Sequence, residues 1–542
     1  MHASPVVIKL FAALGKFFQG FQCSSMPLLL FHPIKIACMN TTLLNKMLMA
    51  AIVFFLTTTA GEDAHSQVGV FDQSSDIGNV LHKGSATYDA AKDQYDLKGS
   101  GANMWFGKDE FHYLYKKMTG DFILQAQAAF VGKGTDMHRK FGWMIRNSLD
   151  TSSAMVSAQV HGDGLTSLQY RKTTGANVEE KRSTIKGPDV VQLERRGNKY
   201  IMSTAHFGEP YVVEEYEESV LNNEVYVGIF VCSHNKDVVE EVLYDNVRIN
   251  VPAKSTFIPY RDYIGSRIET MDVTTGKRMV EYTEPVSLQA PNWTPNGKSL
   301  IYNSGGLIYK LDLATKKPAV INTDFVKSNN NDHVISFNGK MLGLSSSSGD
   351  KKYGSMVYVV PMAGGVPKQI TPVGPSYLHG FSPDGKYVIY TAQRNNDFDI
   401  YKKDLKGGEE VNLTNSPGLD DGSEYSPDGK YIYFNSTRSG LMQLWRMKPD
   451  GSQQEQLTFD EYNNWFPHIS PNGKMIAFLT FGKEVKPDDH PFYKHVYLRL
   501  MPVAGGKPTV IAYLYGGQGS INTPSWSPDS KKIAFVSNSD MK

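Results

Sequence analysis

Apolar and polar residues alternate with a period of two along most of the chain between residues 67 and 252. In one segment every second residue is apolar: Phe122, Leu124, Ala126, Ala128 and Phe130. Segments 141–145 and 225–231 show the same alternation. Side chains at alternate positions share one face of a β-strand, and the Gly, Asp and Asn residues between the segments are typical of tight turns. The pattern therefore predicts a β-sandwich over residues 67–252.

A short turn motif recurs through the C-terminal half of the chain. Its five clear copies, each with a Pro followed by Asp or Asn, lie at residues 294–298, 382–386, 426–430, 470–474 and 527–531. A degenerate copy lies at 336–340, and successive copies are 42, 46, 44, 44 and 57 residues apart. Proline restricts φ, and Asp-Gly or Asn-Gly forms the turn between two strands. A period near 44 residues matches one four-stranded blade of a β-propeller.

The hairpins between the motifs indicate how the propeller closes. Outer hairpins follow the first five motifs, at residues 307–322, 357–371, 399–414, 443–458 and 496–511. The sixth outer hairpin, residues 267–282, precedes the first motif instead. We therefore expect the first and last segments of residues 258–542 to share one blade of a six-bladed ring, which leaves no free sheet edge.

These repeats resemble the TolB-like propeller family, whose members are often described as periplasmic components of the Tol system. The resemblance is carried by residues 419–427, 463–468 and 516–522 and covers about 280 residues. It implies a six-bladed propeller. TolB itself carries an α/β domain before its propeller, whereas this sequence predicts a β-sandwich there.

The N-terminal region resembles concanavalin A-like (laminin-G-like) jelly-roll modules. The matching segments are residues 141–149, 168–171, 191–198, 226–229 and 245–249. Such modules often accompany carbohydrate-active proteins; some bind glycans, and many serve only as spacers. The expected fold class is thus all-β, with a jelly-roll sandwich followed by a six-bladed propeller.

The first 66 residues carry the pattern of a secretory signal. Lys46 precedes an almost wholly apolar run, residues 47–56, and the small residues Ala64 and Ser66 frame a cleavage site. The run is too short to span a bilayer, so no transmembrane span is expected in the mature chain. We expect residues 1–66 to be a leader, with Met39 or Met47 as an alternative start, and the mature protein to be periplasmic or secreted.

The composition excludes some classes of function. With 56 basic and 55 acidic residues, the chain lacks the basic excess that nucleic-acid binding requires. It contains no Gly-x-Ser-x-Gly, Walker, Cys-x-x-Cys or His-Glu-x-x-His motif. Cys23 and Cys38 lie in the expected leader, so the mature chain forms no internal disulfide. Cys232 lies in an apolar strand and is expected to be buried.

Polar and aromatic residues gather just before the turn motifs. That segment is the innermost strand of each blade, and its start lies at one mouth of the central channel, a concave place that ligands favour. The residues expected there are His333, Tyr377, His379, Asp420, Asp421, Glu424, Asn463, Asn464, Trp465, His468 and Asn522, with Asn331 and Asp332 beside them. These residues either hydrate the channel and cap strands, or bind a ligand, or form a metal or catalytic site. Trp465 either stacks on a sugar ring or packs between blades.

Three histidines from three blades form the candidate metal site: His333, His379 and His468, beside Glu424. Imidazole and carboxylate groups are suitable ligands for Zn, Mn or Fe, and histidine is an acid–base near neutral pH. Propeller lyases that act on uronic-acid oligosaccharides use a His-rich metal site in a comparable channel, which is an analogy of fold. A divalent metal is the one cofactor that this grouping suggests.

An insertion at residues 483–494 accounts for the longest spacing between motifs. Loops that exceed a repeat often lie on its binding face, and the alternative is a solvated loop. Three functions follow from the sequence, one of them a scaffold in an envelope complex. The first is a non-catalytic exported protein that binds a glycan, a cell-wall component or an envelope protein. The alternative is a polysaccharide lyase or glycosidase with its site at the channel mouth.

Overall fold

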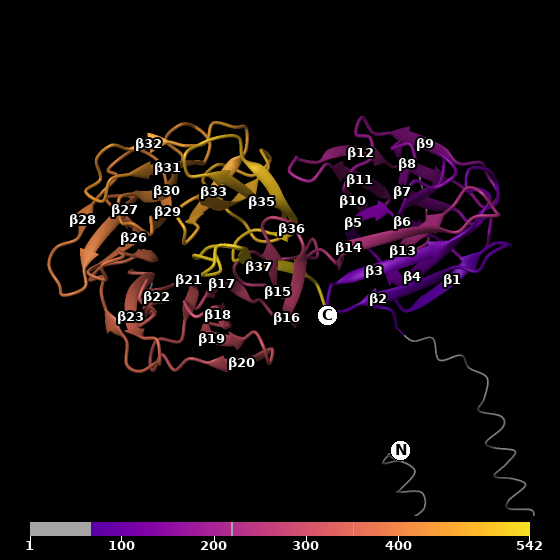
Figure 1. The fold of residues 1–542 in the computed structure, drawn as a ribbon. Helices are drawn as coiled ribbons and strands as arrows, with labels where there is room; N and C mark the ends of the chain where they lie inside the picture. Colours follow the sequence, from indigo (N-terminus) through magenta and orange to yellow (C-terminus); the bar gives the residue numbers. More distant parts are fainter. Residues whose placement is uncertain (1–66, 218–220, 351) are drawn as a thin grey trace, which may run out of the picture. The chain divides into compact units, whose positions relative to one another are not determined.

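The computed structural model describes residues 67–217, 221–350 and 352–542, whose regular structure is all β (Figure 1). The predicted leader, residues 1–66, lies outside the described residues. In the described part of the chain, no helix has the length and apolar character needed to cross a bilayer. The predicted fold class, a β-sandwich followed by a six-bladed propeller, is confirmed.

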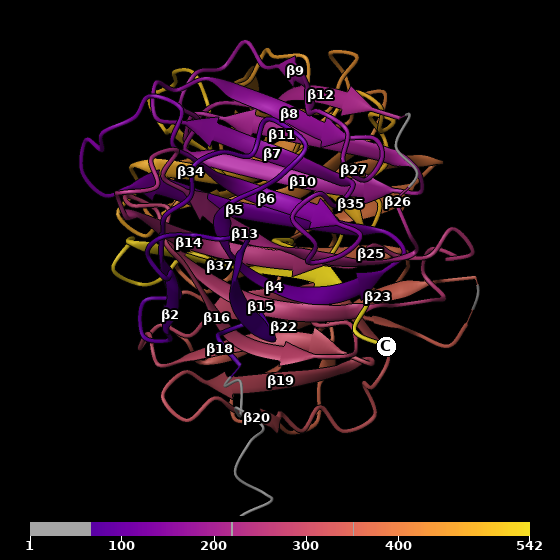
Figure 2. The same cartoon turned by 90° about the vertical axis from the view of Figure 1, so that its right-hand side faces the viewer.

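Two antiparallel seven-stranded sheets form the sandwich and stack face to face (Figures 1 and 2). The first sheet has the order β1 (Gln73–Ile77), β4 (Phe111–Thr119), β13 (Glu224–Cys232), β6 (Lys140–Arg146), β7 (Met155–His161), β8 (Thr166–Arg171), β9 (Glu179–Arg182). The second has the order β12 (Val212–Tyr216), β11 (Lys199–Ala205), β10 (Val190–Arg196), β5 (Phe122–Phe130), β14 (Glu240–Asn250), β3 (Gln94–Gly99), β2 (Ser85–Asp89).

The sandwich core consists of the alternate apolar positions of both sheets. Phe122 and Leu124 of β5 are fully buried against residues such as Trp143 of β6, while Ala128 and Phe130 near the end of β5 are only partly covered. Cys232 is a buried free cysteine, as predicted, and burial raises the pKa of its thiol to about 11. The period-two pattern therefore identified the core face of these strands.

Six sheets form the propeller, and in five of them four strands run outward from the channel (Figure 1). These blades are β17 (Gln289–Trp293), β18 (Ser299–Ser304), β19 (Leu307–Asp312), β20 (Lys317–Val320); β21 (Asn329–Ile335), β22 (Met341–Ser347), β23 (Ser355–Pro361), β24 (Lys368–Gln369); β25 (Ser376–Phe381), β26 (Tyr387–Arg394), β27 (Asp397–Asp404), β28 (Val411–Asn412); β29 (Asp420–Tyr425), β30 (Ile432–Ser436), β31 (Gln443–Met447), β32 (Glu455–Gln456); and β33 (Asn463–Ile469), β34 (Met475–Phe481), β35 (Lys494–Pro502), β36 (Thr509–Gly516).

The sixth blade joins the two ends of the repeat array. It has the strand order β16 (Arg278–Glu284), β15 (Gly265–Asp272), β37 (Lys532–Ser539), and Ile268 of β15 pairs with Val536 of β37. Next to β37, where the other blades have their innermost strand, this blade has a single bridge between Trp526 and Ile533 in place of a fourth strand. The predicted ring closure is therefore confirmed.

Each turn motif folds as its residues dictate. In the copy at 382–386, the Gly385 N–H donates to the carbonyl of Ser382, and the Asp384 carboxylate accepts from the Lys386 N–H. Gly385 adopts a φ of +71°, in the left-handed region that favours glycine. These turns are architectural, as predicted.

A buried ion cluster lies on β15. Glu269 is fully buried and accepts hydrogen bonds from Arg278 of β16 at 2.6 Å, from Arg248 of β14 at 2.8 Å and from the hydroxyl of Ser537. Burial alone would raise the pKa of Glu269, but the two guanidinium groups hold that pKa far below its usual range. The carboxylate is therefore ionised in the folded protein.

Candidate functional site

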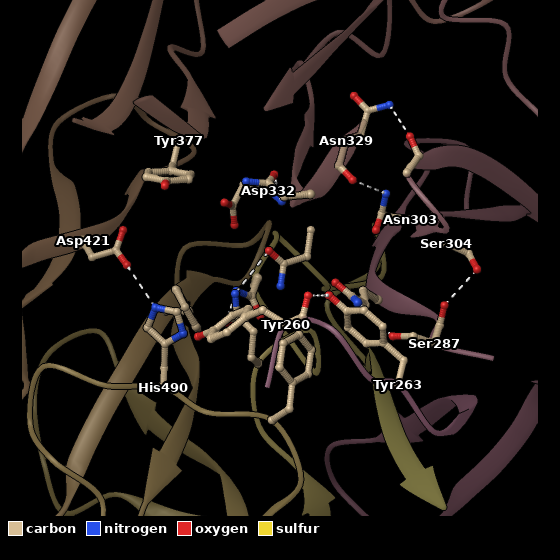
Figure 3. Close-up of a pocket in the computed structure, with 18 of the residues that line it drawn as sticks. Tyr260, Tyr263, Ser287, Asn303, Ser304, Asn329, Asp332, Tyr377, Asp421 and His490 are labelled. Atoms are coloured by element: carbon tan, nitrogen blue, oxygen red, sulfur yellow. Dashed lines mark hydrogen bonds and ion pairs between the residues drawn. The ribbon is translucent and has the colours of Figure 1, made fainter. Parts of the chain in front are cut away.

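A cavity of about 1290 Å³ opens where the inner strands of the propeller begin. It is lined by the first residues of several inner strands, by the ends of second strands such as β18, by the segment before β15 and by the insertion between β34 and β35. Figure 3 shows Asp332 between Tyr377 and Asn329 along one side of this cavity, with His490, Tyr260 and Tyr263 facing them. The cavity therefore corresponds to the predicted channel mouth.

Bulges in the inner strands turn side chains into the channel. The β25–β26 ladder steps from Leu378–Tyr390 to Gly380–Ile389, so His379 is an extra, unpaired residue. In β21 the ladder resumes only at His333 after Asn329, which leaves residues 330–332 outside it. Similar register shifts occur in β17, β29 and β33. A bulge re-aims the side chain that it carries, and here the bulged residues of β21 and β25 line the cavity.

His379 and Asp421 form a buried ion pair on one wall of the cavity. The distance from His379 Nε2 to Asp421 Oδ1 is 3.0 Å, and the hydroxyl of Thr391 also donates to Asp421 at 2.7 Å. Burial by itself lowers the pKa of His379, but Asp421 and the other nearby carboxylates raise it above its usual value. The pKa of Asp421 is lowered to about 2, because His379 outweighs the effect of burial. The contact thus favours the charged forms of both groups, imidazolium and carboxylate.

Asp332 occupies the same wall but has no such cation. Its pKa is raised to about 6 by burial, although His379 and hydrogen bonds from Asn522 and Asn330 oppose the change. The two carboxylates, Asp332 and Asp421, therefore differ widely in pKa within one cavity.

Amide side chains line the rest of the wall. Asn329 Oδ1 and Asn331 Nδ2 are buried and have no hydrogen-bond partner within the described structure. The other group of each amide is satisfied, because Asn329 Nδ2 donates to the carbonyl of Gly306 at 2.8 Å and Asn331 Oδ1 accepts from Gln518 at 3.3 Å. Buried polar atoms are rarely left unpaired. Both atoms are covered by protein, so they lie unpaired within the wall of the cavity and offer no exposed group to a ligand.

Aromatic residues from two segments complete the lining. Tyr260 and Tyr263, which precede β15, each place their ring centroids 5.5 Å from that of Phe492 in the insertion. His490 of the insertion lies 3.9 Å from Asp421 and packs edge-on against Trp465. The insertion predicted to lie on a binding face thus contributes to the cavity.

Four of the eleven predicted site residues line the cavity: Tyr377, His379, Asp421 and Asn522. The other seven do not: His333, Asp420, Glu424, Asn463, Asn464, Trp465 and His468. Several of these have structural partners. Asp420 pairs with Arg438 at 2.7 Å, and the fully buried Trp465 packs between strands, so it is not exposed for stacking on a sugar.

The structure does not bring the three candidate metal-ligating histidines together. His468 contacts Glu424 at 2.7 Å through Nδ1 and the carbonyl of Ile521 through Nε2, while His333 Nε2 contacts the carbonyl of Ile301 at 3.3 Å. Of these three histidines, only His379 lines the cavity. Among the described residues, no group of three His, Cys, Asp or Glu side chains is arranged to hold a metal ion. The bulges separate these histidines, because they direct His379 inward and leave the other two within the blades.

Several lining residues were not predicted as site residues. Asn303 and Thr391 lie on second strands, and Tyr260 and Tyr263 lie in the segment before the propeller. For Tyr260 and Tyr263, the available sequence signal was the occurrence of two tyrosines close together in a short connecting segment.

We expect His333 to make the propeller less stable in acid. Burial lowers the pKa of this histidine to about 4, and its Nδ1 has no partner in the described structure. In the unfolded chain, His333 gains a proton as the pH falls through 6.5, the usual pKa of histidine. In the folded chain, it gains that proton only near pH 4. The free energy of unfolding should therefore fall by on the order of 3 kcal/mol as pH decreases through this window. Urea unfolding at several pH values measures the loss, and His333→Gln should flatten the profile. An unchanged profile in that variant would contradict the assignment.

Comparisons with known proteins agree with the fold. The model of the TolB β-propeller domain matches residues 378–487. An uncharacterised protein of Agrobacterium fabrum is 43% identical over 272 residues, which are 50% of this chain and 92% of that protein.

Solved structures were also compared. A candidate TolB from Agrobacterium tumefaciens is 42% identical over 51% of this chain and 99% of that chain, with a TM-score of 0.49. TolB from Acinetobacter baumannii is 19% identical over 60% of this chain and 80% of that chain, with a TM-score of 0.37.

Proposed function

The chain belongs to the family of TolB-like β-propeller proteins, and from this premise we propose that it is an exported binding protein that holds a glycan at the mouth of its propeller channel. The leader predicted for residues 1–66 supports a location in the periplasm or outside the cell. The resemblance of the sandwich to concanavalin A-like jelly rolls, some of which bind glycans, supports a carbohydrate ligand.

The amide side chains that line the cavity carry this proposal. Each sugar hydroxyl both donates and accepts, so a glycan suits the amides of Asn330, Gln518 and Asn522 in the lining. The aromatic residues Tyr260, Tyr263 and Phe492 offer apolar faces beside these polar groups. A cavity of about 1290 Å³ accommodates several sugar residues, and it combines apolar surface with a few oriented polar groups as binding sites do.

A screen of soluble glycans tests the proposal. A glycan that binds only the native protein should raise its melting temperature. The variant Asn330→Ala should bind that glycan about 10-fold more weakly, the cost of one hydrogen bond in the cavity. The matched control is Asn223→Ala, which alters an exposed asparagine of the sandwich and should leave the affinity unchanged. Equal affinity in the Asn330→Ala variant, or no stabilisation by any glycan, would exclude this function and favour an envelope protein as the partner.

A second candidate function is glycan cleavage. The observation that favours it is the contrast between Asp332, with a pKa near 6, and Asp421, with a pKa near 2, since an acid and a base require carboxylates of unequal pKa. Release of shortened sugars by the wild-type protein, but not by Asp332→Asn, would support the enzyme. Bound glycan recovered intact after long incubation would support binding alone.

A further inference from the structure

The cavity is poor in cationic groups. Among its lining residues, all of which belong to the described part of the chain, Lys542 is the single lysine, no arginine occurs, and the two histidines, His379 and His490, both lie against Asp421. Three carboxylates, Asp332, Asp421 and Asp488, line the same space. Proteins bind carboxylate, sulfate and phosphate groups mainly through Arg and Lys. The lining is therefore unsuited to glycans rich in acidic groups.

Asp332 differs from the other buried carboxylates of the inner strands. Asp420 pairs with Arg438 at 2.7 Å, Glu424 with His468 at 2.7 Å and Asp421 with His379 at 3.0 Å. For Asp332, which is 7% exposed, no Lys, Arg or His nitrogen of the described residues lies within 4 Å. A buried carboxylate is normally paired with a cation. Asp332 thus has no cation within 4 Å in the described structure, and its compensation comes from hydrogen bonds with Asn522 and Asn330 and from the more distant His379.

The surroundings of Asp332 suit an ammonium group. The carboxylate faces the cavity on the same side as the ring of Tyr377 (Figure 3). A carboxylate beside an aromatic ring binds an ammonium ion through charge and through the electrons of the ring. Asp421 does not compete for this cation because His379 already neutralises it.

We infer that Asp332 is the counter-ion for an ammonium group of the ligand, and that the channel mouth selects oligosaccharides that carry free amino groups. This inference rests on the proposed glycan-binding function. It names the class of ligand: amino sugars without an N-acetyl group. The neutral amides beside Asp332 in the cavity lining then bind the hydroxyl groups of the same chain.

Isothermal titration of the full-length protein with three tetrasaccharides tests the inference. The probes are a glucosamine tetramer, its fully N-acetylated form and a galacturonic acid tetramer, each at a pH where the amines are protonated. We expect the glucosamine tetramer to bind at least 10-fold more tightly than the N-acetylated one, since a hydrogen bond between charged groups is stronger than one to a neutral amide. The galacturonic acid tetramer should bind most weakly.

Two aspartate variants make the test specific to one carboxylate. Asp332→Asn keeps the shape of the side chain and should abolish the preference for the free amine, while binding of the N-acetylated tetramer changes less than about twofold. The matched control, Asp488→Asn, removes an exposed acid that lines the same cavity and should keep the preference. The wild-type preference for free over acetylated amines needs no variant, so a misfolded Asp332→Asn protein does not prevent the test.

The possible outcomes distinguish the amine preference from the proposed glycan binding. Equal binding of the free and N-acetylated tetramers would overturn the amine preference and leave the glycan site intact. An equal loss of the amine preference in the Asp488→Asn variant would also overturn it. The overall negative charge of the cavity, and not Asp332, would then explain the preference. Glycan binding by none of these probes, or binding unaffected by Asn330→Ala, would overturn the proposed function and the inference with it.

Discussion

Replacing Glu269 with alanine lowers the free energy of unfolding of the propeller by about 3–5 kcal/mol, because it leaves buried charges without a partner. The Arg278 and Arg248 guanidinium groups both donate to this carboxylate, and neither arginine is more than 5% exposed. Because the pKa of Glu269 is depressed, its contribution is present above its usual pKa of 4.5 and is lost only in stronger acid. Urea unfolding at neutral pH, followed by tryptophan fluorescence, measures the change.

An exposed ion pair provides the control for this prediction. Glu224 lies 2.8 Å from Lys117, and both side chains are more than half exposed. Glu224→Ala should change the free energy of unfolding by less than about 1 kcal/mol, as surface pairs do. If Glu269→Ala were as mild as Glu224→Ala, the buried cluster would not be holding β15 and β16 in place.

Replacing Trp465 with alanine should destabilise the propeller by about 3–5 kcal/mol, the usual cost of removing a large buried aromatic side chain. Trp465 is fully buried in a cluster with Leu479 and Leu498. Its ring centroid also lies 4.5 Å from that of His490, which lines the cavity. The variant should therefore weaken ligand binding as well, because His490 of the insertion would lose its packing contact with Trp465. Thermal unfolding and ligand titration measure the two effects.

Trp445→Ala serves as the comparison, since this tryptophan of β31 is only partly buried and lies away from the cavity. It should cost less stability and leave ligand binding unchanged. A Trp465→Ala protein with wild-type stability would show that the cavity wall does not depend on that side chain.

The fold was predictable because its signals are local. Alternation over Phe122–Phe130 gives the strand and its core face, and the turn motif at 382–386 dictates its own hairpin. Ring closure followed from counting hairpins, because an unpaired outer hairpin at 267–282 needs an inner partner and β37 provides it.

The site was less predictable because its side chains depend on bulges. The motif identifies the inner strands but not the extra residue in each, and one extra residue reverses which side chains face the channel. His379 is such an extra residue and lines the cavity, whereas His468 lies beyond the bulge of β33 and contacts Glu424. Tyr260 and Tyr263 belong to no repeat, so no period could place them.

The pairing of β15 with β37 has a consequence for the timing of folding. Asn538 donates to Ser266 across 272 residues of sequence, so this contact must wait until almost the whole propeller has been synthesised. Closure over such a separation is slow, and until then the backbone groups of β15 that face β37 stay unpaired. Exposed strand edges attract strands of other chains. A chain that stalls or is cut before residue 532 should therefore aggregate instead of persisting as a five-bladed ring.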